Sequence, residues 1–304
     1  MASTFWMNGV KVEDTFSEMF SMWVSRVVIT ADTKKWAMTA ARTATGFGSA
    51  IFMSPAEAGV ERLIPSDETP DGRPGAVIQV WQRTRRELKK QLISRIGSCV
   101  LTCPTTSVFD GLPRAKRRLK VGRGIRYFGD GFQEEGEVAR RRVWRIPVME
   151  GEFIIEDAFG AQIGVAGGNF IIMARTRGAG LGAAEEAVSA IKQNVEGVIL
   201  SFPGGICRSG SKIGSRKYKL TASTNHPFCP TLREAIPSET MIPEGVSTIY
   251  EIVINGLSLD AVNEAISQGI KRAVKVPGVE RITAVNFGGR LGQYRSNLKS
   301  ICLP

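Results

Sequence analysis

A single glutamate inside an apolar strand is the first residue of this sequence that could do chemistry. The run Tyr250-Glu-Ile-Val-Ile-Asn-Gly-Leu257 predicts a strand whose alternation puts Glu251, Val253 and Asn255 on one face. A carboxylate in apolar surroundings is expected to have a raised pKa, which suits acid–base work near neutral pH. The alternative is a strand glutamate held in a salt bridge.

Other catalytic side chains are scarce. The sequence has one histidine, His226, which precedes a proline in a predicted loop and is expected to be a surface or packing residue. Its 5 cysteines are scattered and odd in number, which favours reduced thiols. A single histidine excludes histidine-based zinc and iron sites, so no metal is expected. No Ser-His or Cys-His pair is available for nucleophilic catalysis.

A glycine motif has the spacing of a dinucleotide-binding loop. Gly178-Ala-Gly-Leu-Gly-Ala183 follows a predicted strand and opens a predicted helix. The acidic residue that such a site needs at the end of the next strand is missing, because Ser201-Phe-Pro203 stands there. We therefore do not expect a bound dinucleotide.

An internal repeat predicts the elements that must position these residues. Val12-Glu-Asp-Thr-Phe16 matches Ile155-Glu-Asp-Ala-Phe159, 143 positions later, and residues 27–31 match 170–174 at the same offset. Apolar runs, Ala-rich segments and amphipathic segments then follow in the same order in both halves. The predicted elements after the first strands are a helix at 36–45, strands at 50–55 and 76–81, a helix at 85–96 and a strand at 100–101, then a helix at 181–193, strands at 198–203 and 248–254, a helix at 259–273 and a strand at 282–285.

The repeated order βαββαβ is the ferredoxin-like plan. The predicted fold class is α+β, with two ferredoxin-like lobes packed together, each a mainly antiparallel sheet with helices. The expected domains are an N-terminal lobe with a basic insert, residues 1–147, and a C-terminal lobe, residues 148–304. The first lobe places Ile78 or Gln79 at the position of Glu251, which predicts one active site per chain.

The net charge of +11 comes almost entirely from one segment. Residues 81–150 hold 17 of the 40 basic residues but only 7 of the 29 acidic ones. This segment is interpreted as a solvated insert, as a nucleic-acid site, or as a site for an acidic small-molecule tail or protein. Nucleic acid fits poorly, because no recognition helix or RNA-binding strand accompanies the basic run.

Several loops contain glycine, asparagine and acidic residues at positions where stability alone would not require them. Through these strings the sequence resembles the formylmethanofuran–tetrahydromethanopterin formyltransferase family, from about Met7 to Tyr294. The strings that carry the resemblance are 68–75 (ETPDGRPG), 128–135 (FGDGFQEE), 148–157 (VMEGEFIIED), 165–170 (VAGGNF), 202–206 (FPGGI), 222–225 (ASTN), 250–257 (YEIVINGL) and 286–294 (NFGGRLGQY).

The resemblance implies a cytoplasmic one-carbon enzyme with two ferredoxin-like lobes. It implies reversible transfer of a formyl group between the furfurylamine nitrogen of methanofuran or methylofuran and a ring nitrogen of tetrahydromethanopterin. It further implies no bound cofactor, assembly as homodimers and homotetramers, and a substrate cleft at a subunit interface. It points to Glu251 as the proton-transfer residue. Since no enzyme nucleophile is available, direct amine attack in a ternary complex is expected.

The substrate-binding candidates are of three kinds: polar side chains in loops, glycines that allow a substrate to approach the backbone closely, and aromatic rings that could stack on the ring systems of the substrates. Each could equally be a turn or packing residue. The candidates are Ser223, Asn225, Asn286 and Gln293; Gly204 and Gly205; and Phe202, Phe287 and Tyr294.

The basic segment fits a further role, because methanofuran-type carriers have glutamate-rich tails. We expect Arg117, Arg118, Arg140 and Arg141 to bind such an anionic tail. A basic insert suggests a bacterial, methylotroph-type member, a subunit of a formyltransferase/hydrolase complex with formylmethanofuran dehydrogenase-like partners. The alternative function is a non-catalytic, carrier-binding scaffold subunit. The N-terminus has no signal-peptide pattern, and neither nucleic acid nor a membrane is expected as a partner.

Overall fold

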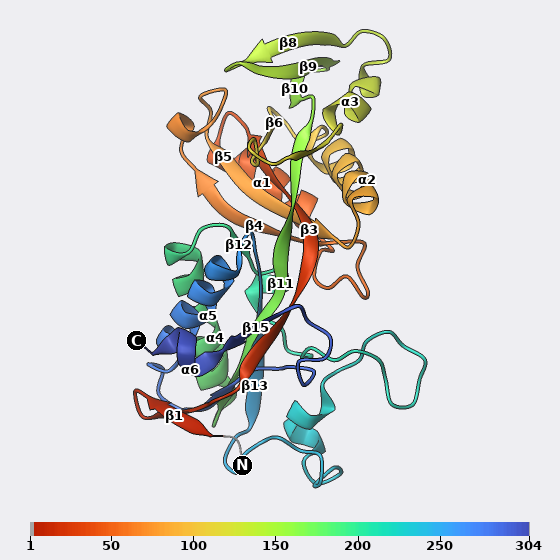
Figure 1. Ribbon diagram of the computed structural model, residues 1–304. Coiled ribbons are helices and arrows are strands. Elements are labelled where there is room, and N and C mark those ends of the chain that lie inside the picture. The colour runs from red at the N-terminus through yellow and green to blue at the C-terminus, as the bar shows by residue number, and fades with distance from the viewer. Residues whose placement is uncertain (1–2, 304) are drawn as a thin grey trace. The chain divides into compact units, whose positions relative to one another are not determined.

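A computed structural model describes residues 3–303 of the chain, which form two compact units. The first unit contains residues 1–21 and 165–304, and the second contains residues 22–164. This division differs from the expected boundary at residue 147, because the N-terminal strands pack with the C-terminal half of the chain. Figure 1 shows the elements of both units.

Unit 2, residues 22–164, is built on the first βαββαβ order. Its strands run β4-β5-β3-β6 across an antiparallel sheet, and β10 and β9 and then β8 extend the sheet beyond β6. This is the ferredoxin-like strand order that the repeat predicts. The elements are β3 (Phe16–Thr30), α1 (Lys34–Thr45), β4 (Glu57–Ile64), β5 (Gly75–Gln82), α2 (Arg85–Arg95), β6 (Ser107–Asp110), β7 (Arg117–Leu119), α3 (Gly122–Ile125), β8 (Glu134–Val138), β9 (Arg141–Val148) and β10 (Gly151–Glu156).

Unit 1 repeats the same order with the second half of the chain. Its antiparallel strands run β12-β13-β11-β14, and β14 pairs in parallel with β2. The predicted α+β class with two ferredoxin-like lobes is therefore confirmed. The elements are β1 (Thr4–Met7), β2 (Val10–Glu13), β11 (Phe159–Ala174), α4 (Arg177–Asn194), β12 (Val198–Ile199), β13 (Thr248–Gly256), α5 (Leu259–Ala273), β14 (Val279–Thr283), β15 (Tyr294–Asn297) and α6 (Leu298–Cys302).

The main helices of both units begin in the same way. Each follows a strand and starts after a serine or threonine whose hydroxyl accepts a hydrogen bond from a backbone N–H three residues on. These pairs are Thr33 with Trp36, Thr84 with Glu87, Thr176 with Ala179, and Ser258 with Ala261. The duplicated strand-to-helix turn thus rests on a local capping bond in every copy.

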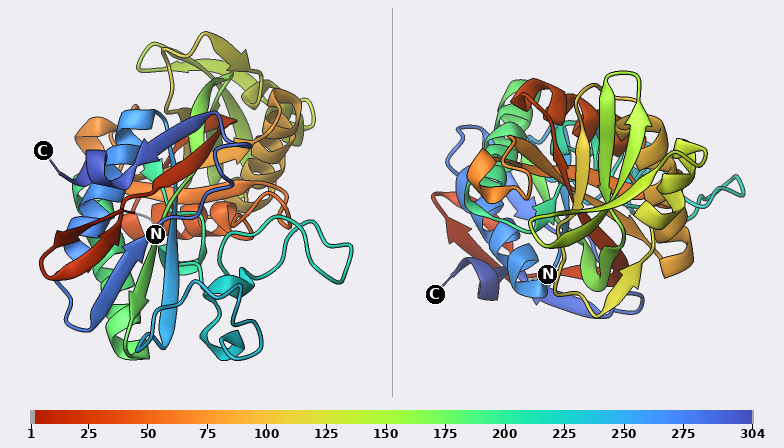
Figure 2. Two further views of the ribbon diagram at one scale, coloured as in Figure 1. Left: turned by 60° about the horizontal axis from the view of Figure 1, so that its bottom comes forward. Right: turned by 90° about the horizontal axis from the view of Figure 1, so that it is seen from above.

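The helices of unit 1 cover one face of its sheet and leave the other to a long loop. Phe170, Ile252 and Ile282 lie on the helix side, in a core shared with α4 and α5. Between β12 and β13 the chain leaves this body as the long teal segment of Figures 1 and 2. Gly180, the middle glycine of the motif 178–183, belongs to the core, because a Cβ there would lie 2.5 Å from Thr248 Cγ2. Close helix–strand packing therefore explains this one glycine, whereas Gly178 and Gly182 have open space around them.

Two predicted strands were wrong. Residues 50–55 form turns in which Ser54 donates to the carbonyls of Ala50 and Ala56, and Met53 is exposed. The strand comes later, as β4, whose run EAGVERLI carries a weaker apolar signal. Residues 100–101 continue helical structure beyond α2, and the closing strand is β6. The predicted strand at 198–203 is reduced to the two residues of β12.

A buried carboxylate network lies at the ends of β6 and β10 in unit 2. Asp110 Oδ2 accepts a hydrogen bond from Arg118 at 2.5 Å, and its Oδ1 accepts the N–H groups of Leu112 and Gly160. Glu156 Oε2 accepts Arg141 at 2.9 Å and the N–H of Asp110. Burial raises the pKa of Glu156, and the bonds from Asp110 N–H and Arg141 oppose that rise. Arg118 and Arg141 therefore compensate buried charge.

No helix in residues 3–303 is both long and apolar enough to cross a membrane.

We predict that Arg118→Gln and Arg141→Gln each lower the free energy of unfolding by roughly 3 kcal/mol, because each removes the nearest cation from a buried carboxylate. Arg117→Gln is the matched control, since Arg117 is exposed and makes no ion pair with the described residues; we expect a change below about 0.5 kcal/mol. Urea unfolding at pH 7 measures all three. Equal effects at positions 117 and 118 would contradict the network.

Candidate active site

Glu251 lies on the helix-free face of the unit 1 sheet. In the registers of the sheet it pairs with Ile171, which pairs with Thr283 on its other side. Side chains opposite one another in such a row share a face. The predicted alternation along β13 is confirmed, because Ile252 and Ile254 lie in the helix-side core.

Burial without a cation defines the state of Glu251. The residue is 1% exposed, and its Oε2 accepts the N–H of Ser211 at 2.7 Å. Its Oε1 is buried and has no hydrogen-bond partner among the described residues. Burial raises the pKa of Glu251 to about 7, while the hydrogen bonds from Ser211 oppose the rise. Such a carboxyl group can exchange a proton near neutral pH.

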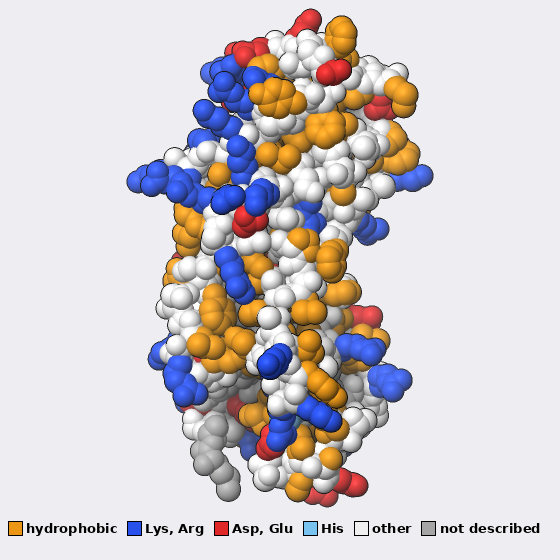
Figure 3. Space-filling view, turned by 90° about the vertical axis from the view of Figure 1, so that its right-hand side faces the viewer, with side chains coloured by type: hydrophobic (Ala, Val, Ile, Leu, Met, Phe, Trp, Pro, Cys, Tyr) orange, Lys and Arg blue, Asp and Glu red, His pale blue; other side chains and the backbone are white. Residues whose placement is uncertain are grey.

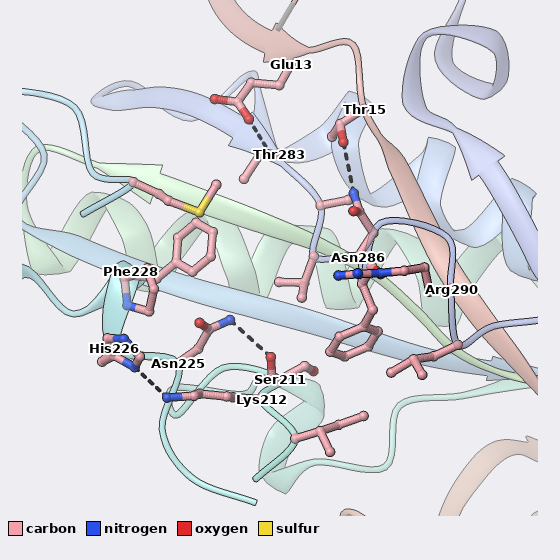
Figure 4. Close-up of a pocket in the computed structure, with 17 residues that line it drawn as sticks. Glu13, Thr15, Ser211, Lys212, Asn225, His226, Phe228, Thr283, Asn286 and Arg290 are labelled. Carbon is pink, nitrogen blue, oxygen red and sulfur yellow. Dashed lines mark hydrogen bonds between the residues drawn. The ribbon is translucent and has the colours of Figure 1, made fainter. Parts of the chain in front are cut away.

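A cleft of about 810 Å³ lies beside this residue, within unit 1. One wall is the segment around residues 211–228, and the other follows the end of β14 through residues 283–291 (Figure 4). Glu251 itself is not among the lining residues, but its partner Ser211 and its row neighbour Thr283 are. One hydrogen bond therefore separates the buried carboxyl group from the cleft wall.

The segment that carries Ser211 is an irregular hairpin. Asn225 N–H donates to Ser209 O at 2.8 Å, Ser223 N–H donates to Lys212 O, and Ile213 bridges Ala222. Asn225 is 8% exposed, and its side-chain amide donates to Ser211 O at 3.0 Å. The hairpin 209–225 thereby fixes both the backbone donor of Glu251 and the start of the cleft wall.

The opposite wall depends on one carboxylate, Glu18 of β3. Its two oxygens accept four backbone N–H groups, from Phe287, Gly289, Leu291 and Gly292, at 2.6–2.9 Å. Burial alone would raise the pKa of Glu18, but these four bonds lower it to about 2. The loop 286–292 is therefore held by an ionised carboxylate. No sequence pattern predicts this contact, because Glu18 is about 270 residues distant.

A chain of polar contacts ends in the cleft. Lys212 Nζ lies 2.5 Å from His226 Nδ1, and His226 Nε2 lies 2.9 Å from Glu239 Oε2. Arg216 holds the other oxygen of Glu239 at 2.9 Å. The hydrogen bond from His226 is the main cause of the lowered pKa of Glu239. His226 was expected to be a surface or packing residue without partners. It instead contacts Lys212, 14 residues earlier in the sequence, and Glu239, 13 residues later.

Three of the nine predicted binding residues line the cleft. Asn225 lies on the hairpin wall, and Asn286 and Phe287 lie on the opposite wall. The Asn286 amide donates to Thr15 Oγ1 and to Phe16 O at 3.1 Å, so it is fixed to the start of β3 (Figure 4). The Phe287 ring lies 6.2 Å from that of Phe20.

The other six lie outside the lining residues. Ser223 donates to Gly214 O within the hairpin. Phe202, Gly204 and Gly205 belong to the turn after β12, and a Cβ on Gly205 would lie 3.0 Å from Leu200 Cδ1. Gln293 Oε1 accepts Ser21 N–H, and the Tyr294 hydroxyl lies 3.4 Å from that of Ser21. These contacts are those of turn and packing residues.

The predicted anionic-tail residues also divide into two groups. Arg118 and Arg141 are engaged by Asp110 and Glu156, whereas Arg117 and Arg140 make no ion pair with the described residues. Among residues 3–303 there is no group of three histidine, cysteine or acidic side chains that could hold a metal ion.

The corresponding position in unit 2 is apolar. The repeat aligns Val28 with Ile171, and Val28 pairs with Val77 where Ile171 pairs with Glu251. Val77, rather than the expected Ile78 or Gln79, therefore occupies the place of Glu251. The duplicated fold has kept the carboxylate in one copy.

Comparison with known proteins identifies relatives over nearly the whole chain. The family model for formylmethanofuran–tetrahydromethanopterin formyltransferase matches residues 5–148, and the model for the proximal lobe of the same family matches residues 151–301. A formylmethanofuran–tetrahydromethanopterin formyltransferase of Methanocaldococcus jannaschii is 52% identical over 97% of this chain and 99% of its own. That of Methanopyrus kandleri is 53% identical with the same coverage.

Two solved structures are similar throughout. The formyltransferase from Methanosarcina barkeri matches with a TM-score of 0.94 and 48% identity, over 98% of this chain and 100% of its own. The formyltransferase/hydrolase complex from Methylorubrum extorquens, solved with methylofuran, contains a chain that matches with a TM-score of 0.94 and 42% identity, over 99% of both.

We predict that Glu18→Gln lowers the free energy of unfolding by about 2 kcal/mol at pH 7, because the amide nitrogen replaces an acceptor and leaves buried N–H groups unpaired. Glu18 has a lowered folded-state pKa, so its contribution is present above about pH 4.5 and is lost as the pH falls toward 2. The difference between wild type and variant should therefore shrink on acidification. Urea unfolding between pH 7 and pH 3.5 measures this.

The exposed Glu185 of α4 supplies the control, Glu185→Gln, for which we expect no comparable pH-dependent loss. A Glu18→Gln difference that does not change with pH would contradict the role of the charge.

Proposed function

This chain belongs to the formylmethanofuran–tetrahydromethanopterin formyltransferase family, and we propose that its reaction takes place at the cleft of unit 1, with Glu251 as the acid–base group. The chain is a formyltransferase, acting between methanofuran or methylofuran and tetrahydromethanopterin. The observation that carries the site assignment is the buried Glu251 carboxyl group with one unpartnered oxygen beside that cleft.

Transfer of a formyl group between two amines needs one proton removed and one supplied. The attacking pterin nitrogen forms a bond to the formyl carbon, and the carbonyl electron pair moves onto the formyl oxygen. Ionised Glu251 accepts the proton that the attacking nitrogen loses. It returns that proton to the furfurylamine nitrogen as the old carbon–nitrogen bond breaks and the carbonyl reforms. The carboxyl group ends in its starting state, as reversibility requires.

Oε1 of Glu251 is the oxygen available for this exchange, since Oε2 is held by Ser211. Because the whole residue is buried, proton exchange with a substrate requires the hairpin 209–225 to shift. The hairpin is attached to Glu251 through Ser211 N–H, and the chain just before it is attached through the pair of backbone bonds between Cys207 and Glu251. Substrate binding at its wall can therefore act directly on the carboxyl group.

Direct amine attack in a ternary complex is favoured over a covalent enzyme intermediate. Cys207 is the thiol nearest along the sheet to Glu251, but burial raises its pKa, with the charge of Glu251 as a further cause. Its thiolate form is thereby suppressed. His226 has both ring nitrogens engaged by Lys212 and Glu239.

We propose Asn225, Asn286 and Phe287 as the substrate contacts, because they line the cleft. Ser223, Gly204, Gly205, Phe202, Gln293 and Tyr294 have contacts that suit support of the surrounding loops. The alternative function, a carrier-binding scaffold without catalysis, would not need a buried carboxyl group with a pKa of about 7.

The basic surface of unit 2 suits an anionic carrier tail. Figure 3 shows Lys and Arg side chains gathered over the upper part of the molecule, which carries β8, β9 and β10. Arg117 and Arg140 are the members of the predicted set that remain available. We propose these two, with the exposed Arg114, Lys116 and Lys120, as the surface that attracts a glutamate-rich tail.

Assembly and cell type are further parts of the proposal. We propose that the chain forms a homodimer or homotetramer in the cytoplasm, uses no bound cofactor, and works with formylmethanofuran dehydrogenase-like subunits. The similar chain in the bacterial formyltransferase/hydrolase complex supports the last point. The sequence identities do not favour a bacterial, methylotroph-type origin, because the archaeal relatives are 52–53% identical to this chain and the bacterial one is 42% identical. That part of the proposal rests on the basic segment alone.

We predict that Glu251→Gln lowers kcat at least about a hundredfold, because the amide cannot carry the proton. For wild type, kcat/KM should rise with pH and level off above about pH 7, as the carboxylate forms. The folded-state pKa is raised, so the stabilisation from the protonated form is complete below about pH 4.5 and lost as the pH rises to 7. Glu251→Gln should lack that loss. Steady-state formyl transfer and urea unfolding across pH 5–8.5 measure both.

Glu244→Gln, at an exposed position, is the matched control and should keep the wild-type pH profile. A folded Glu251→Gln protein with near-normal transfer would remove Glu251 from catalysis.

We predict that Arg117→Gln/Arg140→Gln raises KM for the furan substrate about threefold to tenfold at low salt, with kcat unchanged. The reason is lost electrostatic attraction, so the difference should fade as ionic strength rises. Lys34→Gln/Arg42→Gln removes the same charge from exposed positions on α1 and serves as control. Unchanged KM and unchanged assembly with partner subunits would reduce the patch to a solvated surface.

A further inference from the structure

Cys207 lies beside the buried carboxyl group of Glu251. The chain after β12 returns to β13 as an isolated bridge, in which Cys207 N–H donates to Glu251 O at 2.8 Å and Glu251 N–H donates to Cys207 O at 2.9 Å. Two residues that exchange both backbone bonds in this way have their side chains on the same face of the sheet. Ile171 is the neighbour of Glu251 on the other side. The carboxyl group therefore lies between one thiol and one hydrocarbon side chain.

The polar side chains of the neighbouring strands are engaged elsewhere. The Asn169 amide of β11 donates to two backbone carbonyls, and its oxygen accepts a third backbone group. The Thr283 hydroxyl of β14 donates to Glu13. Neither side chain therefore supplies a donor to Glu251.

The charged groups near the cleft also have contacts of their own or are exposed. They are Glu13 with Arg281, Lys212 beside His226, Glu239 with Arg216, and the exposed Arg290. The cause of the raised pKa of Glu251 is its burial. The lateral neighbours of the carboxyl group therefore decide how well its charge is accommodated.

The thiol offers Oε1 of Glu251 no strong donor. Cys207 is 2% exposed, and a buried cysteine behaves as a small apolar residue with a weak S–H donor. Its own polar contact is the Ser209 hydroxyl, 3.4 Å from Sγ. Oε1 is buried and has no hydrogen-bond partner among the described residues. A serine in place of Cys207 would have nearly the same size but a strong O–H donor, and hydrogen bonds to a carboxylate lower its pKa.

The bridge also keeps the thiol in place when the hairpin moves. Proton exchange requires the hairpin 209–225 to shift, because Ser211 N–H holds Oε2 of Glu251. Cys207 precedes the hairpin, and its two backbone bonds attach it to β13 itself. The surroundings of Oε1 are therefore retained while those of Oε2 change.

We infer that Cys207 is a positioning residue for the proposed acid–base group: its thiol fills the space beside Glu251 and leaves Oε1 without a donor, so that this oxygen is free to take and return the transferred proton. The inference rests on the proposed role of Glu251. Cys207 forms no covalent bond and carries no proton in the reaction.

Cys207→Ser supplies a hydroxyl donor beside the carboxylate. The midpoint of the rise of kcat/KM with pH should therefore move from about pH 7 to about pH 6. The plateau value of kcat should fall about threefold, because a carboxylate of lower pKa is a weaker base. Cys302→Ser is the matched control, since Cys302 is buried on α6 and should leave the midpoint unchanged. Steady-state transfer between pH 5 and 8.5 measures both.

An isosteric pair of variants separates hydrogen bonding from packing. Threonine and valine have the same shape and differ by one hydroxyl group. Cys207→Thr should lower the midpoint as Cys207→Ser does, and Cys207→Val should keep the wild-type midpoint. The pair also serves if the serine variant does not fold. Equal shifts in the threonine and valine variants, or no shift in a folded hydroxyl variant, would overturn the inference.

A direct titration keeps this inference separate from the proposed function. In protein isotopically labelled at the glutamate carboxyl carbons, the NMR signal of Glu251 is the one that Glu251→Gln lacks. Its midpoint should lie near pH 7 in wild type and near about pH 6 in Cys207→Ser. Wild type without transfer activity would refute the function and leave this titration measurable. Active wild type with the same midpoint in Cys207→Ser would refute the role of Cys207 alone.

Discussion

The hydrogen bond from Ser211 N–H to Glu251 Oε2 is the interaction on which the site depends. Ser211 is the residue that bonds a carboxyl group which is 1% exposed. A buried carboxylate normally needs a cation or several donors, and hydrogen bonds from one residue do not offset the burial of the charge. The group is therefore poised between its two protonation states, which is the condition for acid–base work.

The same bond ties a loop to the proposed acid–base group. Ser211 belongs to the hairpin 209–225, whose far leg brings Asn225 and His226 to the cleft. Any movement of this hairpin changes the donor of Glu251 and the direction of Lys212 together. The opposite wall is rigid by comparison, because Glu18 holds its backbone through four charge-assisted bonds. One wall is thus fixed while the other can respond to substrate.

How far the sequence could predict these features follows from the range of the interactions. The repeat and the strand alternation are local, so they predicted the α+β class, the βαββαβ order and the face on which Glu251 lies. They failed at residues 50–55, where an apolar run forms turns, because the true edge strand β4 is less apolar than its neighbour. The contacts of Glu18 could not be found, since they join segments about 270 residues apart. Those of Lys212 and His226 span only 14 residues, but they depend on an irregular hairpin that has no strand or helix pattern. The predicted boundary at residue 147 lies where the two family models meet, whereas clustering of the fold places residues 3–21 with the C-terminal half, a grouping that arises from pairing between distant segments.

The two units show how one fold accommodates a structural and a reactive carboxylate on the same kind of surface. On the helix-free face of unit 2, Glu61 is bound by both Arg26 Nε and Nη2, at 2.8 and 2.7 Å, and by Gln79 at 2.8 Å. Those partners pair it with a cation and fix both of its oxygens. On the equivalent face of unit 1, Val253 stands where the repeat places Gln79, so Glu251 has neither the arginine nor the amide. Glu61 lies on β4 and Glu251 on β13, so the two glutamates occupy different strands of the repeat. The same kind of sheet face therefore carries a glutamate with an arginine and an amide beside it in one unit, and a glutamate without either in the other.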